Sequence, residues 1–204
     1  MRPGVGAAQA PAVSWPSADS VAHGSSRAWT GGVQAYWYAL GAESYLLSIA
    51  SADRSALHLE ARYQYEALHT ASAWVGWTQV LGARPTFEIV PMAGVLFGRS
   101  RGAALGFEAT LSLTHFELYD EAEMVLFTGG EQNFLYDWFT AAWHATAWLD
   151  VGLSVQRTRT HASGLATDRG VFGALSYRRA TLSVYGLDLT GNAPFAILAL
   201  GFEP

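Results

Sequence analysis

The feature that most restricts the fold is a strict alternation of apolar and polar residues over residues 55–66. One set of side chains is apolar and ends in two tyrosines: Leu57, Leu59, Ala61, Tyr63 and Tyr65. The other set is polar or charged: His58, Glu60, Arg62, Gln64 and Glu66. Because side chains alternate between the two faces of a strand, this period of two predicts a strand and not a helix. Its apolar face can pack on a second sheet in a soluble sandwich, or meet lipid in a transmembrane barrel.

The composition favours the barrel. Half of the 204 residues are hydrophobic and 14% are charged, against about 25% charged residues in a typical soluble domain. The mean hydropathy is +0.14, yet no stretch reaches the ~20 continuous apolar residues of a transmembrane helix. The net charge of −5 argues against nucleic-acid binding. The absence of cysteine excludes disulfides and thiolate metal sites.

Strand-like runs follow one another from Gly32 onward. They predict an all-β fold: a transmembrane antiparallel up-and-down β-barrel of about twelve strands, with ten as the alternative. The expected strands cover residues 33–40, 43–53, 55–66, 70–81, 86–98, 102–113, 116–128, 134–145, 149–160, 168–177, 180–189 and 194–202. Residues 1–30 are rich in Ala, Ser, Gly and Pro and predict a flexible N-terminal tail, so the barrel occupies residues 31–204.

The connections alternate in length, as they do in outer-membrane barrels. Tight turns are expected near residues 53–54, 82–85, 114–115, 146–148 and 178–179, with looser connections between them. An even number of strands then places both termini on the periplasmic side of the outer membrane. Many aromatic residues fall near strand ends, where amphipathic rings prefer the membrane–water boundary: Tyr65, Trp77, Phe97, Phe127, Trp143, Trp148, Tyr177 and Phe202.

These features resemble those of small bacterial outer-membrane β-barrels. The length and strand number are similar to those of the small twelve-stranded monomeric porins for acidic oligosaccharides, whose pores are lined by arginine. The segments at residues 52–54, 57–63, 91–94 and 156–159 also resemble stretches of uncharacterised outer-membrane barrel proteins, which implies a fold but no activity. The last strand ends in an aromatic residue, Phe202, which resembles the signal read by the barrel-assembly machinery. The partners that the resemblance implies are this machinery, membrane lipids and other envelope proteins.

The inward face of the barrel supplies the candidate site. The residues expected to line a lumen or pore are His58, Glu60, Arg62, Gln64, Glu66, Glu88, Glu108, Thr110, Glu117, Tyr119, Glu121 and Glu123. The turn at residues 114–115 sets Glu108 almost opposite Glu121 on the next strand. Carboxylates this close recruit cations or protons, and acidic rings favour cations in channels. We therefore expect a narrow passive pore for small solutes or cations.

Two alternatives remain open at this point. Arg62, Arg157 and Arg159 could pair the acids in a closed polar core, with turn register setting Arg157 near Asp137 and Arg62 near Trp74. An unpaired buried charge costs several kcal/mol, and the acids outnumber these arginines, which favours a wet interior. The barrel could also be a non-transporting structural subunit or anchor of an envelope assembly.

An enzyme is less favoured. A lipid hydrolase at the external rim could use His69 or His161, but the sequence contains no G-x-S-x-G, H-E-x-x-H or P-loop motif. His58 and Glu60 have a same-face spacing that fits a metal site, although a lumen histidine in a hydrogen-bond network is far commoner. We therefore predict no catalytic residue, no metal ligand and no cofactor.

Overall fold

The computed structural model describes residues 28–40, 43–160, 164–191 and 193–204. They form β1 (Thr30–Leu40), β2 (Glu43–Arg54), β3 (Leu57–Tyr63), β4 (Thr70–Trp77), β5 (Gln79–Leu81), β6 (Thr86–Gly98), β7 (Gly102–Ser112), β8 (Phe116–Phe127), β9 (Phe134–Thr146), β10 (Leu149–Thr160), β11 (Gly164–Tyr177), β12 (Ala180–Leu187) and β13 (Phe195–Phe202). The described residues include no helix that is long and apolar enough to cross a membrane. The tail expected over residues 1–30 lies almost wholly outside the described residues.

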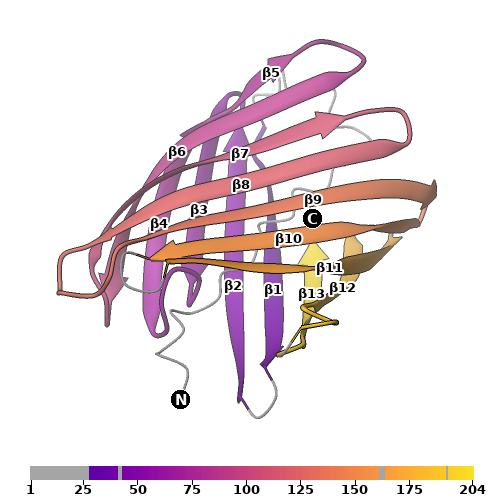
Figure 1. Cartoon of the computed structure of the whole chain (residues 1–204). Helices are drawn as coiled ribbons and strands as arrows, with labels where there is room; N and C mark the ends of the chain where they lie inside the picture. Colours follow the sequence, from indigo (N-terminus) through magenta and orange to yellow (C-terminus); the bar gives the residue numbers. More distant parts are fainter. Residues whose placement is uncertain (1–27, 41–42, 161–163, 192) are drawn as a thin grey trace.

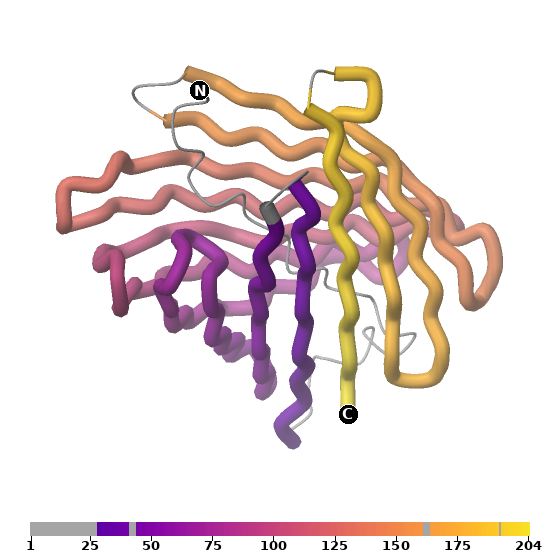
Figure 2. Tube along the Cα trace, turned by 90° about the horizontal axis from the view of Figure 1, so that it is seen from below, coloured from indigo at the N-terminus to yellow at the C-terminus, as the bar shows by residue number. Residues whose placement is uncertain are grey.

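The strands close into a single antiparallel barrel (Figure 1). β1 pairs with β13, with Val33 opposite Phe202, so the first and last strands lie side by side (Figure 2). β5 continues β4 along β6 in one register, because Gly76 faces Met92 and Gln79 faces Ile89. The ring therefore has twelve strands and one short extension, which confirms the predicted number and rules out ten.

The connections alternate between the two ends of the barrel as predicted, but the first short turn lies at residues 55–56 and not at 53–54, because β2 continues to Arg54. The short turns at residues 55–56, 82–85, 113–115, 147–148 and 178–179 lie at one end, together with the start of β1 and the end of β13. The connections at residues 64–69, 99–101 and 128–133 lie at the other end. This arrangement gives the strand register directly, because each short turn fixes which residues of its two strands face each other.

Alternation along the strands separates a buried inner face from an exposed outer face. In β8 the acidic residues Glu121 and Glu123 are buried, whereas Met124 and Leu126 on the other face are exposed. Large apolar side chains with an exposed fraction of 51–60% occur all around the barrel, for example at Val33, Leu105, Leu153, Val184 and Leu200. An exterior this apolar requires hydrocarbon around it, as in a transmembrane barrel.

One part of the alternation was predicted wrongly. Gln64 was expected on the inner face and Tyr65 on the outer face, near the membrane boundary. β3 instead ends at Tyr63, and Gln64 has a left-handed backbone with φ of 60°. The Gln64 amide donates to the Leu46 carbonyl on an exposed part of the surface. The chain direction changes there, so that both Tyr65 and Glu66 are buried.

The alternative of a closed polar core, in which Arg62, Arg157 and Arg159 pair the interior acids, holds for Arg62 alone. Arg157 does pair with Asp137 through two hydrogen bonds, and the register sets these residues opposite each other. However, Ser154 and Gln156 are buried, so Arg157 and Arg159 lie on the outer face of β10 and are exposed. Neither arginine can neutralise the acids inside the barrel.

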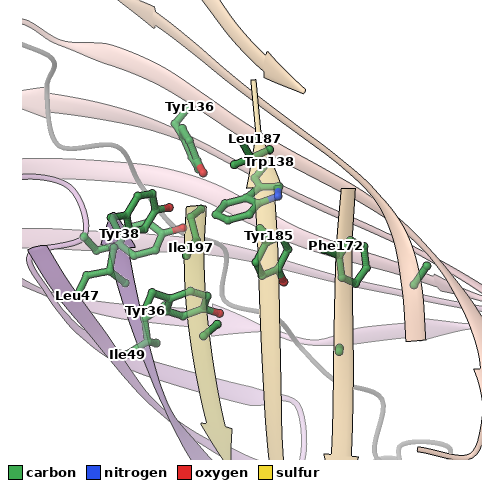
Figure 3. Packing of buried hydrophobic residues seen from close by; sticks show 14 residues of the cluster. Tyr36, Tyr38, Leu47, Ile49, Tyr136, Trp138, Phe172, Tyr185, Leu187 and Ile197 are labelled. Atoms are coloured by element: carbon green, nitrogen blue, oxygen red, sulfur yellow. The ribbon is translucent and has the colours of Figure 1, made fainter. Parts of the chain in front are cut away.

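Apolar side chains fill much of the interior that the structure describes. The larger cluster is built on β1, β2, β9, β11, β12 and β13, and its largest members are aromatic (Figure 3). Trp138 and Tyr185 meet edge to face, and Phe172 stacks on Tyr185. A second cluster contains Trp74 and Met92 on the wall formed by β4, β6, β7 and β8. Arg62 contacts both clusters, through Tyr65 of the first and Trp74 of the second.

Candidate functional site: the acidic interior

The structure places most of the predicted lumen residues inside the barrel. Nine of the twelve are buried: His58, Glu60, Arg62, Glu66, Glu108, Glu117, Tyr119, Glu121 and Glu123. Glu88 and Thr110 face each other on the inner side of β6 and β7 and are half-buried. Gln64 is the exception described above. Glu108 and Glu121 lie directly opposite each other, as the turn register predicted.

Arg62 is the centre of this interior. Its Nε donates to Glu60 Oε2 at 2.6 Å, and its Nη1 donates to Glu121 Oε1 at 3.0 Å and to Glu123 Oε2 at 3.3 Å. Glu108 Oε1 lies 3.8 Å from Nη2. The side chain has no exposed area, so these contacts replace the water that a guanidinium would otherwise bind. One arginine on β3 thus connects carboxylates of β3, β7 and β8 across the barrel.

Two aromatic rings hold the guanidinium in place. Its central carbon lies 4.5 Å from the ring centre of Tyr65 and 4.6 Å from that of Trp74. A planar cation over the face of an aromatic ring is stabilised by the ring quadrupole, and more strongly when water is excluded. Tyr65 also donates its hydroxyl to Glu121 Oε1 at 2.7 Å, so the same residue orients both partners.

A second branch of the network contains Glu66. Its Oε1 accepts a hydrogen bond from Ser72 Oγ at 2.6 Å and another from Trp74 Nε1 at 3.0 Å. Gly94 makes room for the Trp74 ring, because a Cβ at Gly94 would lie 2.4 Å from it. Alternation from Thr70 would have placed Ser72 and Trp74 on the inner face, but we did not predict them as site residues.

A third branch begins at His58. Its Nδ1 lies 2.7 Å from Asp53 Oδ1, and its Nε2 lies 3.3 Å from Glu60 Oε1. Glu60 therefore connects this branch to Arg62 through its second oxygen. Asp53 was another residue missed by the sequence reasoning. The turn at residues 55–56 sets it opposite His58, and that register could have identified it.

The candidate rim residues show no comparable arrangement. His69 is exposed in the connection between β3 and β4, with a left-handed backbone. Its backbone amide donates to Gln64 Oε1 at 3.4 Å. His161 lies outside the described residues.

The sequence matches no protein-family model and no curated protein. Similar solved structures include a KdgM porin and a NanC porin, each with a TM-score of 0.60, 8% identity, and coverage of 84% of this chain and 98% of that chain. Another KdgM porin structure is a complex with disordered oligogalacturonate. At this identity the likeness shows the fold alone. The chain has the fold of the small twelve-stranded outer-membrane porins, and with its apolar exterior it is a barrel of the outer membrane.

Proposed function

We propose that this barrel, which has the fold of the small outer-membrane porins, is a narrow passive pore for small solutes or cations. The observation that carries the proposal is the excess of negative charge inside. Six glutamates are buried, and Arg62 is the one arginine among the buried residues that the structure describes. Acidic side chains along a passage attract cations and repel anions. The proposed selectivity is therefore cationic.

The interior also argues against transport of an acidic oligosaccharide. A KdgM porin structure holds oligogalacturonate, which is an anion. In the present barrel such a ligand would meet Glu60, Glu108, Glu121 and Glu123 around a single arginine. Because like charges repel strongly where water is scarce, the acidic interior disfavours this class of solute.

The packing of the interior supports a narrow passage and not a wide one. Trp138, Tyr38 and Leu187 have no exposed area, although they point into the barrel. Solutes that pass must therefore be small.

Single-channel recording in planar bilayers tests the proposal. We expect a small conductance whose reversal potential in a salt gradient shows cation selectivity. The triple variant Glu108→Gln, Glu121→Gln, Glu123→Gln should reduce that selectivity, because it removes three of the buried charges. The matched control is Glu131→Gln, which changes an exposed carboxylate in the connection between β8 and β9 and should leave the selectivity unchanged.

The packed apolar clusters favour one other function, that of a structural barrel of the envelope that does not conduct. Correctly folded protein that gives silent bilayers would support this second function. Anion selectivity in the parent protein would contradict the proposal of a cation-selective pore.

A further inference from the structure

Three side chains inside the barrel converge as metal ligands would. His58, Glu60 and Glu108 each offer one ligand atom, and these atoms all lie within 4.8 Å of one another. All three residues are buried. The atoms His58 Nε2 and Glu60 Oε1 are 3.3 Å apart. Zinc bonds of about 2.0–2.1 Å separate neighbouring tetrahedral ligands by about 3.3–3.4 Å. Two of the three ligand atoms are therefore already spaced for one ion, and the Glu108 oxygen lies within 4.8 Å of both.

The second observation is that Glu108 has a buried polar atom without a hydrogen-bond partner. Glu108 Oε1 makes no hydrogen bond, and its contact with Arg62 Nη2 is 3.8 Å long. His58 is 7% exposed and Glu108 is 6% exposed. A buried polar atom without a partner costs about 1–3 kcal/mol. A cation bound between His58, Glu60 and Glu108 would give Glu108 Oε1 a partner.

The orientation of the His58 ring also fits a ligand. A contact of 2.7 Å between Nδ1 and the Asp53 carboxylate requires the proton on Nδ1, because the carboxylate can only accept. The other ring nitrogen, Nε2, faces Glu60 Oε1, and a metal ion bound there would take the place of the proton on this nitrogen. A histidine oriented by a carboxylate on one nitrogen and bound to a metal through the other is a recurrent arrangement in metal sites.

The charge balance leaves room for a second cation. Arg62 contacts four carboxylates, those of Glu60, Glu108, Glu121 and Glu123. A cation beside Glu60 and Glu108 would also be attracted by the other acidic groups around it. Glu60 can contact Arg62 and the metal ion at the same time. Its Oε2 accepts a hydrogen bond from Arg62, while its Oε1 faces His58.

From these observations we propose that His58, Glu60 and Glu108 bind a divalent transition-metal cation of the zinc class, with Asp53 as the residue that positions His58. One imidazole and two carboxylates suit Zn²⁺ better than Mg²⁺ or Ca²⁺, which prefer six or more oxygen ligands. The site does not depend on whether the barrel conducts.

The test uses the full chain refolded in detergent micelles, stripped with a chelator, and then dialysed against Zn²⁺ alone. We expect one Zn²⁺ per chain. His58→Gln and Glu108→Gln should each weaken binding at least tenfold. Asp53→Asn should weaken it about 10- to 100-fold, as changes of such supporting carboxylates do. The matched control is His144→Gln, because His144 also pairs with an aspartate, Asp150, but belongs to no cluster of three ligands among the described residues.

A second readout separates loss of the site from loss of the fold. Co²⁺ bound by the parent protein should give visible d–d absorption bands that excess Mg²⁺ does not remove and that Glu108→Gln reduces. Heat-modified migration in gels identifies the variants that have folded. Absence of stoichiometric binding or of the Co²⁺ bands in the parent protein would overturn the proposal. Parent-like affinity in folded His58→Gln and Glu108→Gln would also overturn it.

Discussion

Replacing Arg62 by methionine should destabilise the barrel more than any exposed substitution. The change removes hydrogen bonds to Glu60, Glu121 and Glu123 and the contacts with the Tyr65 and Trp74 rings. It also leaves several buried carboxylates facing each other without a cation. Removing one partner of a buried ion pair typically costs about 3–5 kcal/mol. We expect the free energy of unfolding to fall by about this amount.

Urea unfolding of the barrel in lipid vesicles, followed by tryptophan fluorescence, measures the effect. For a slope of about 3 kcal/mol per molar, the midpoint should fall by more than about 1 M. The control is Arg101→Met in the exposed connection between β6 and β7, which should change stability by less than about 0.5 kcal/mol. Adding Glu121→Gln to Arg62→Met should recover part of the loss, because one fewer charge is then unpaired. If Arg62→Met behaved like Arg101→Met, the account of the interior network would be refuted.

Two further substitutions test the packing of the interior by the same unfolding measurement. Gly94→Ala should cost about 1–3 kcal/mol, because the new Cβ meets the Trp74 ring, and should change the near-ultraviolet circular dichroism. Gly173→Ala is its control, since the nearest atom to a Cβ there is 3.9 Å away. Trp138→Ala should cost about 3–5 kcal/mol, because it removes a fully buried side chain and its bond to Ser154. A cost below about 1 kcal/mol would mean that Trp138 does not pack as described.

Much of the barrel could be predicted from local patterns. A period of two identifies which side chains share a face, and a short turn fixes which residues are opposite across two strands. These two rules were enough to predict that Glu108 faces Glu121 and that Arg157 lies beside Asp137. They were also enough to place nine of the predicted lumen residues in the interior.

The same rules do not predict contacts between strands that are not neighbours in the barrel. Arg62 lies on β3 and its partners Glu121 and Glu123 lie on β8, and these two strands are not neighbours in the ring. Their contact depends on the diameter of the closed barrel and on the packing of Tyr65 and Trp74, which no local period encodes. Tyr65 itself was misplaced because a non-glycine residue, Gln64, takes a left-handed backbone. Arg157 was given the right neighbour but the wrong face, because register alone does not assign faces.

The measurement that tests the central claim most directly is quenching of single tryptophans by lipids with brominated acyl chains. Trp138 and Trp143 lie on the same strand, β9, but Trp138 is fully buried inside and Trp143 is 49% exposed on the outer face. Two variants, each keeping one of these tryptophans and phenylalanine at the other tryptophan positions, are refolded into such vesicles. We predict strong quenching of Trp143 and weak quenching of Trp138. Equal quenching of the two residues, or none for Trp143, would contradict the assignment of the apolar face to lipid and the ionic face to the interior.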